Sequence, residues 1–337
     1  MIIKENHQKI ISYWILSSIT LIFLMIIVGG LTRLTNSGLS ITEWELFKGI
    51  LPPINAESWN NYFELYKKIP QYELVNMNMS LYEFKIIFLW EYFHRLLGRV
   101  IGIVYLLPLI YFTYKKVLSK NNLLDYYSIF ILILFQGFIG WYMVKSGLVN
   151  DITVSHYRLS LHLLGAFIII SILYWKYLNI INSTNKYFFK KDNLVLKLLF
   201  FLILFQICIG AFVSGLDAGL IYQTWPKMNS SFFPDDLQIK NIFFLSIFSE
   251  QSFVQFFHRT LAYLITLYVI YIGVKYYLFK KEKHFKSYFL VFILLFLQIV
   301  LGIFTLISGL SLYLASLHQI TSVILVFSVL NFNHKFA

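Results

Sequence analysis

Four histidines stand at corresponding places in apolar stretches of the chain and form two pairs. His94 and His162 lie in the first half of the sequence, and His258 and His318 lie in the second. Each is roughly one to two helical turns inside the same end of its apolar stretch. An imidazole within an apolar helix is costly and indicates a function by default. The spacing therefore predicts two sites with two imidazoles each.

Paired imidazoles without clustered carboxylates favour axial ligation of haem iron between helices. Zinc usually takes three or four protein ligands, and the single cysteine, Cys208, excludes a cysteine cage or a redox pair. The alternative, four unrelated histidines bonded to the backbone, requires four coincidences in depth. We expect the remaining histidines at the membrane interface (His156) or in solvated segments (His7, His284 and His334).

Arginines accompany the predicted haem ligands. Arg95 and Arg259 each follow a histidine directly, Arg158 lies four residues before His162, and Arg99 lies one turn beyond Arg95. Haem propionates are carboxylates, which guanidinium groups bind well. The alternative is that these side chains extend to lipid headgroups, which fits Arg158 better than Arg99.

The two pairs differ in one neighbouring side chain. Glu91 lies three residues before His94, whereas Gln255 lies three residues before His258. Oxygen insertion or proton-coupled oxidation needs a proton acceptor, which a carboxylate provides and an amide does not. The first site is therefore interpreted as reactive and the second as an electron-carrying haem site. The alternative is that Glu91 is an interfacial carboxylate without a chemical role.

The composition indicates a membrane protein. Of 337 residues, 58% are hydrophobic, 19% aromatic and only 13% charged, whereas soluble domains carry roughly 25% charged residues. We predict an all-α integral membrane protein in which eight apolar stretches span the bilayer. They cover about residues 11–31, 86–112, 123–144, 157–177, 194–215, 253–279, 287–307 and 311–332.

Internal repeats divide the chain into two halves, residues 1–185 and 186–337. LWEYFHRLLG resembles FVQFFHRTLA, and SGLSITEW resembles AGLIYQTW. Four spans per half predict two four-helix bundles related as parallel repeats. Each half has a long outer loop after its first span, residues 32–85 and 216–250. We expect these loops to rest on the membrane surface through Trp44, Trp59 and Trp225.

Basic residues predict the orientation. The net charge is +12, and most lysines fall in the segments that share a side with the N-terminus. By the positive-inside rule, both termini are cytoplasmic in a bacterial inner membrane. The charge is thus a topology signal, and no nucleic-acid partner is expected.

Five motifs together resemble the haem A synthase family, in its mitochondrial and alphaproteobacterial branch. The resemblance extends from about residue 20 to 325, in family order. The motifs are GGLTRLTNSGLSITEW, EYFHRLLGR, YRLSLHLLGA, QFFHRTLAY and LHQITS.

The resemblance implies an oxidoreductase that converts a ring methyl of haem O (the C8 methyl) into the formyl group of haem A for terminal oxidases. It implies that the oxygen comes from water and that electrons pass through a bound haem b. His258 and His318 match the axial ligands of haem b, with Arg259 and Gln255 beside that site. The substrate pocket matches His94, His162, Arg95, Arg99 and Arg158, and Glu91 matches the essential acid.

The outer loops lack the cysteine pairs of another branch, so the electron acceptor stays open. We expect a handover partner, the haem O synthase, and leave a homo-oligomer open. Two alternatives remain. One is a dihaem electron-transfer protein of cytochrome b type without chemistry of its own. The other is a haem or small-molecule transporter that uses the histidines as proton relays.

Overall fold

The computed structural model describes residues 5–43, 48–148, 152–189, 193–237, 245–278 and 284–336. Eight of its helices are long and apolar enough to cross a membrane. The prediction of an all-α, eight-span membrane protein is confirmed. The spanning helices are α1 Glu5–Leu34, α4 Leu81–Tyr114, α5 Lys120–Gly147, α6 His156–Ile181, α7 Leu194–Gly215, α8 Gln251–Leu278, α9 Phe285–Ile307 and α10 Leu312–Phe336.

Helix ends differ from the predicted spans where local capping extends a helix beyond its apolar run. The second span was predicted to begin at about residue 86. Its helix, α4, begins five residues earlier, at Leu81, because Ser80 and Glu83 form a capping box. The Ser80 hydroxyl accepts from the Glu83 amide at 3.3 Å, and the Glu83 carboxylate accepts from the Ser80 amide at 2.8 Å. Both terminal amides are thereby satisfied.

The chain forms two compact units, Met1–Ile169 and Ile170–Ala337. This division by contacts falls inside α6, whereas the sequence repeats divide the chain after residue 185. The domain boundary and the parallel-repeat relation of the halves stay predictions.

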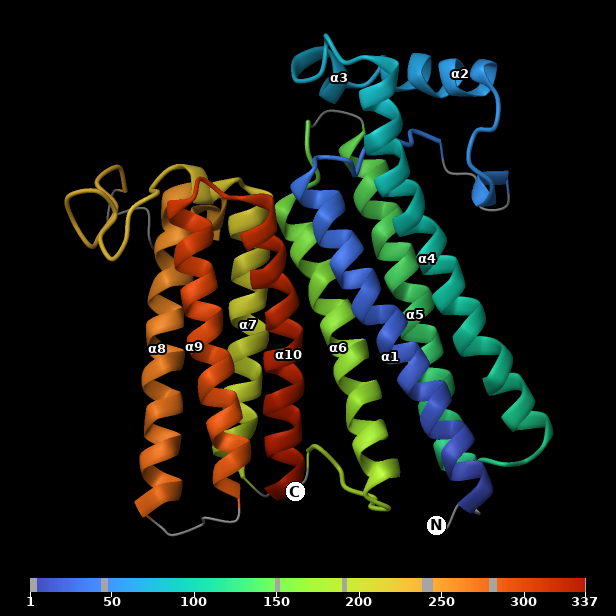
Figure 1. Ribbon diagram of the computed structural model, residues 1–337, viewed down its shortest axis with the longest axis vertical. Helices are drawn as coiled ribbons and strands as arrows, with labels where there is room; N and C mark the ends of the chain where they lie inside the picture. Colours follow the sequence, from blue (N-terminus) through green and yellow to red (C-terminus); the bar gives the residue numbers. More distant parts are fainter. Residues whose placement is uncertain are drawn as a thin grey trace. The chain divides into compact units, whose positions relative to one another are not determined.

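In the first unit, α1 packs on α4 and α4 packs on α5. α1 and α5 run opposite to α4 and α6 (Figure 1). Trp14 of α1 joins these helices at the end away from the long loop. Its ring lies 4.9 Å from that of Tyr105, 5.3 Å from Phe112 and 5.2 Å from Tyr126, measured between centroids.

In the second unit, contacts run from α7 to α8, α9, α10 and back to α7, so the four helices close into a bundle. Short 3-10 helices, η2 Ala218–Leu220 and η4 Leu245–Ser249, lie in the loop between α7 and α8. Asn333 of α10 donates to the Leu196 carbonyl of α7 at 3.1 Å, which ties the ends of these helices together.

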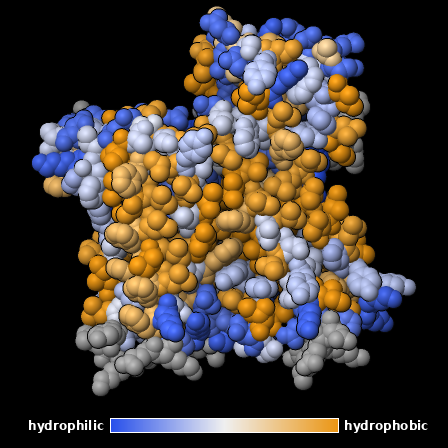
Figure 2. Space-filling view, in the orientation of Figure 1, coloured by the Kyte–Doolittle hydropathy of each residue, from blue (hydrophilic) through white to orange (hydrophobic). Residues whose placement is uncertain are grey.

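The helix surfaces are apolar over most of their length, and hydrophilic residues gather towards the helix ends (Figure 2). Leu107 is 61% exposed, Leu267 63% and Phe296 60%. Large apolar side chains over so much surface require lipid contact. The protein is therefore a multi-pass membrane protein.

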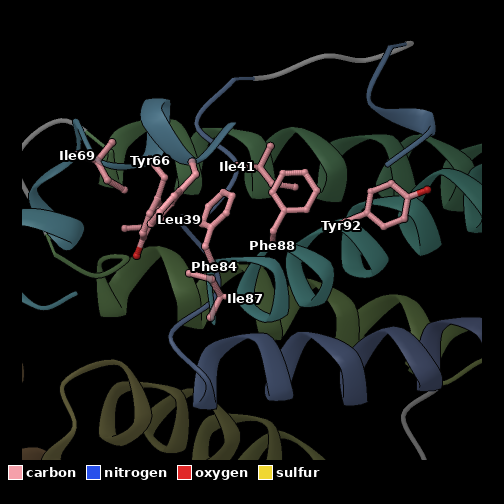
Figure 3. Packing of buried hydrophobic residues seen from close by; sticks show 9 residues of the cluster. Leu39, Ile41, Tyr66, Ile69, Phe84, Ile87, Phe88 and Tyr92 are labelled. Atoms are coloured by element: carbon pink, nitrogen blue, oxygen red, sulfur yellow. The ribbon is translucent and has the colours of Figure 1, made fainter. Parts of the chain in front are cut away.

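The loop after α1 has a hydrophobic core of its own, which the sequence analysis did not predict. It contains η1 Lys48–Ile50, α2 Ala56–Tyr66 and α3 Pro70–Leu74. The core consists of Leu39, Ile41, Phe63, Tyr66, Ile69, Phe84, Ile87, Phe88 and Tyr92 (Figure 3). It joins the loop to the first turns of α4, so the segment around Ile41 is held against that helix.

One prediction is wrong, and others lie outside the described residues. We expected His334 to be solvated, but it is buried, donates from Nε2 to Asn179 Oδ1 at 3.0 Å and packs edge-on against Trp175. It lies on the inner face of α10, where these partners replace water.

The orientation of the chain in the membrane stays a prediction. Among the residues used for orientation and loop placement, the undescribed ones are Lys4, Trp44, Lys190, Lys191, Lys240, Lys280, Lys281 and Lys283.

We predict that Phe84→Ala loosens the loop. Phe84 is fully buried, with its ring 5.0 Å from Phe63 and 5.2 Å from Tyr66, and such truncations cost about 3–5 kcal/mol. Limited proteolysis should cleave the loop at least tenfold faster than in the wild type. Tyr82→Ala, on an exposed side chain of the same helix, is the matched control. Equal cleavage rates in the two variants would contradict the role of this core.

Candidate functional site

The first histidine pair meets inside the first unit. His94 of α4 and His162 of α6 have ring centroids 6.4 Å apart and ring planes at 72°. Metal–imidazole bonds measure about 2 Å, so two rings on opposite sides of one metal have centroids about 6 Å apart. Both histidines are only partly buried. The spacing fits two axial ligands of one haem iron.

A glycine on the preceding spanning helix faces each of these two imidazoles. A Cβ at Gly29 of α1 would lie 3.1 Å from His94 Nε2, and one at Gly140 of α5 would lie 3.0 Å from His162 Cε1. Such distances are closer than normal carbon contacts. The imidazoles therefore occupy space that only glycine leaves open.

The second unit repeats this arrangement. A Cβ at Gly210 of α7 would lie 3.2 Å from His258 Cε1, and one at Gly302 of α9 would lie 3.0 Å from His318 Cε1. His258 and His318 lie within electrostatic range of each other. The structure thus brings His94 and His162 together and sets His258 and His318 in matching positions against glycines of α7 and α9.

His318 has the tautomer that a metal ligand requires. Its Nδ1 lies 3.0 Å from the backbone carbonyl oxygen of Gln298. A carbonyl oxygen only accepts, so Nδ1 carries the hydrogen and the neutral ring keeps its lone pair on Nε2, which lies 3.4 Å from the Gln298 amide nitrogen. A hydrogen bond of this kind commonly orients a histidine that binds metal. The residues of the second site therefore fit a haem held between His258 and His318.

Glu91 is buried and held by four hydrogen bonds. Its Oε2 accepts from the Ser40 hydroxyl at 2.8 Å and from the Ile41 amide at 2.9 Å. Its Oε1 accepts from Arg95 Nε at 3.0 Å and Nη2 at 2.6 Å. These contacts fix the carboxylate one helical turn before His94, where α4 meets the loop that follows α1.

Corresponding arginines fasten the long loop of each half to the helix that follows it. Arg95 Nη2 donates to the Ile41 carbonyl at 2.9 Å, and Arg259 Nη2 donates to the Tyr222 carbonyl at 2.9 Å. Ile41 and Tyr222 are equivalent in the SGLSITEW and AGLIYQTW repeats. Binding of haem propionates by these arginines stays a prediction.

The second site has neither the carboxylate nor the hydroxyl of the first. Gln255 replaces Glu91 and donates to the Tyr222 carbonyl at 2.9 Å. Ile221 stands where the first repeat has Ser40. The same backbone arrangement therefore surrounds an ionisable group in one half and an amide in the other.

The loop of the second half is secured by Asp236. Its carboxylate accepts from the Tyr222 hydroxyl at 2.7 Å and from the Ser252 hydroxyl. Burial alone would raise the pKa of Asp236, but these two hydrogen bonds outweigh it and lower the pKa. Burial and the bond to Asp236 raise the pKa of Tyr222. The carboxylate thus remains an anchor at neutral pH.

The other two predicted arginines lie on α6, four residues before His162, and on α4, five residues after His94. Arg158 Nη1 donates to the Ser146 hydroxyl at 2.5 Å, and its guanidinium carbon lies 5.1 Å from the Tyr142 ring centroid. Arg99 is partly buried on α4, within electrostatic range of Arg95. Among the described residues, no three or more histidine, cysteine or acidic side chains gather as a metal cluster.

Comparison with known proteins places the chain in a family. Residues 12–330 match the model of the COX15-CtaA family, described as cytochrome oxidase assembly protein. The chain belongs to this family. It is 49% identical over 327 residues to a protein of Pelagibacter ubique named Heme A synthase, with 96% of both chains covered.

Other relatives share that name. One from Rickettsia bellii is 42% identical over 325 residues, covering 95% of this chain and 96% of its own. One from Flavobacterium psychrophilum is 38% identical over 344 residues, covering 99% of both. The prediction of an enzyme of the haem A synthase family is therefore confirmed.

The groups that hold the predicted residues have little signal in the sequence. Ser40 and Ile41 lie about fifty positions before Glu91, and only the folded loop shows that they contact it. The glycines that face the histidines had a visible signal. Gly140 and Gly302 occupy equivalent places in the repeats QGFIGWYMVKSGL and QIVLGIFTLISGL.

We predict that Gly140→Ala displaces His162 and lowers haem retention in the first unit several-fold, because the added methyl overlaps the imidazole. Gly137→Ala is the control, since a Cβ there has no neighbour within 4 Å on the same helix. Haem content per chain after loading and gel filtration measures the effect. Equal retention in both variants would show that the glycine does not make room for a ligand.

Proposed function

We propose that this membrane enzyme oxidises a ring methyl of haem O, the C8 methyl, to the formyl group of haem A. The names of relatives at 38–49% identity support this activity. So does the contrast between Glu91 in the first half and Gln255 in the second, because at this position the first half has a carboxylate, which can take a proton, and the second has an amide, which cannot. This contrast carries the proposal.

In the proposed reaction, water supplies the oxygen. A methyl group and one water give a formyl group, and four protons and four electrons leave. The reaction passes through an alcohol and then a gem-diol, which loses water. His94 and His162 hold the substrate by its iron, and Glu91 accepts protons beside it.

Ser40 offers a way to free Glu91 for this role. A carboxylate has about four acceptor positions, and all are used by donors in the resting site. The Ser40 hydroxyl also lies 3.3 Å from the Ile87 carbonyl oxygen. By rotating its hydrogen to that carbonyl, Ser40 vacates Glu91 Oε2, which can then take a proton while Arg95 and the Ile41 amide keep the carboxylate in place.

The second site would hold haem b through His258 and His318, with Arg259 and Gln255 at its outer edge. When bound, that haem accepts and passes on single electrons. Arg259 and Gln255 both bond the Tyr222 carbonyl and thereby cover the site with the loop. The final electron acceptor is a separate molecule.

We further propose that the enzyme lies in a bacterial inner membrane with both termini in the cytoplasm. An apolar haem O would enter from the lipid, delivered by the haem O synthase. This arrangement would limit the release of a reactive porphyrin.

We predict that Glu91→Gln binds haem O and forms little haem A, at least 100-fold less than the wild type, because general base catalysis typically contributes about 10²–10⁴-fold. Pigment extraction and mass analysis after expression with a haem O source measure both quantities. Glu83→Gln, at the exposed start of the same helix, is the matched control and should retain activity. Normal haem A formation by Glu91→Gln would favour a dihaem electron-transfer protein instead.

A further inference from the structure

Three of the four paired histidines are bonded by a glutamine of the preceding spanning helix. Gln206 Nε2 of α7 donates to the His258 backbone carbonyl at 2.9 Å, and Gln298 Nε2 of α9 donates to that of His318 at 2.7 Å. Gln136 Nε2 of α5 donates to the carbonyl of His162. Each amide therefore joins the backbone of a ligand-bearing helix to its neighbour.

These glutamines and the glycines that face the imidazoles form one motif, Q-x-x-x-G. Gln136, Gln206 and Gln298 each stand four residues before the facing glycine, Gly140, Gly210 and Gly302. Residues four apart share a helix face. One face thus provides both a space for the imidazole and a hydrogen bond that fixes the helix carrying it.

The amides also lie beside the imidazole rings. Gln136 Nε2 is 3.2 Å from His162 Nδ1, Gln206 Nε2 is 3.2 Å from Nδ1 and 3.3 Å from Nε2 of His258, and Gln298 Nε2 is 3.4 Å from His318 Nε2. An amide nitrogen only donates and so occupies the lone pair of a ring nitrogen that it contacts, whereas its bond to the backbone carbonyl persists when that ring nitrogen binds iron. The Gln298 amide is itself fixed, because its Oε1 accepts from the Thr321 hydroxyl at 2.5 Å. In lipid, buried amides that find partners in a neighbouring helix stabilise the contact between the helices.

The fourth histidine has a different neighbour. Met25 of α1 stands four residues before Gly29, the glycine that faces His94. Its methyl carbon packs against α4, where a Cβ at Gly98 would lie 3.4 Å from it. A thioether cannot donate a hydrogen bond. The helix turn that carries His94 is therefore not tied to α1 by an amide at this position.

We propose that the glutamine and glycine of each Q-x-x-x-G motif position His162, His258 and His318 as permanent iron ligands. Where Met25 replaces the glutamine, His94 is the ligand that dissociates from the iron. This inference rests on the proposed function, in which haem O must enter and haem A must leave the first site. One firmly held and one releasable imidazole permit that exchange. A haem that stays bound in the second site needs two ligands that do not dissociate, and a glutamine bonds the backbone of both histidines there.

The test is a pair of opposite substitutions read by carbon monoxide binding, which requires a vacated position on ferrous iron. Purified full-length protein is loaded with haem O and reduced, and the rate of carbon monoxide binding is followed by absorbance. Met25→Gln gives α1 the missing amide with little change in side-chain length. Met25→Leu is the matched control, because it changes the side chain without adding a donor.

We expect Met25→Gln to bind carbon monoxide at least tenfold more slowly than the wild type and Met25→Leu to match the wild type. Gln136→Met, which removes the amide beside His162, should bind it several-fold faster. Gln206→Met should make the second haem reactive, whereas the wild-type second haem is not. A loss of folding does not produce these changes in carbon monoxide binding, since each rate is measured on haem that is still bound to the protein.

Equal rates for Met25→Gln and Met25→Leu would overturn the inference, and so would an unchanged rate in Gln136→Met. If Met25→Gln fails to fold, Gln136→Met decides the question alone. The measurement does not depend on turnover. A wild-type protein that binds haem O, forms no haem A and still shows these rate differences would overturn the proposed function and leave the assignment of the releasable ligand intact.

Discussion

Polar side chains inside lipid need partners from the protein, and this constraint governs the architecture around both histidine pairs. An unsatisfied polar group within the membrane costs several kcal/mol. Accordingly, amides of α5, α7 and α9 bond the backbone of the histidine-bearing helices, and glycines let the helices approach closely enough for these bonds. The polar groups that serve chemistry therefore also determine which helices pack together.

The same constraint explains what the two halves share. In each half, an arginine fastens the long loop by bonding a backbone carbonyl at an equivalent position, Ile41 in the first half and Tyr222 in the second. Within this common frame, the first half has Glu91 bonded by Ser40, and the second half has Gln255 with Ile221 in place of the serine. In the proposed function, the difference between the catalytic site and the electron-carrying site thus comes down to a few side chains.

The spans and the histidine pairs were predictable because lipid imposes a strong pattern on the sequence. A run of about 20 apolar residues has few other interpretations, and an imidazole within such a run stands out. The supporting contacts were not predictable. Ser40 bonds Glu91 only because the core around Phe84 folds the loop back onto α4. His334 looked solvated because it lies near a charged terminus, yet Asn179 and Trp175 enclose it.

The central claim is that each histidine pair binds one haem iron through both imidazoles. Electron paramagnetic resonance of the purified ferric protein, together with its iron content, tests this claim most directly. With haem O bound, the account predicts two iron atoms per chain and two low-spin signals of bis-imidazole type, of which only the second-site signal survives when the substrate haem is removed. A high-spin signal at the second site, or a single iron per chain with haem O in excess, would contradict it.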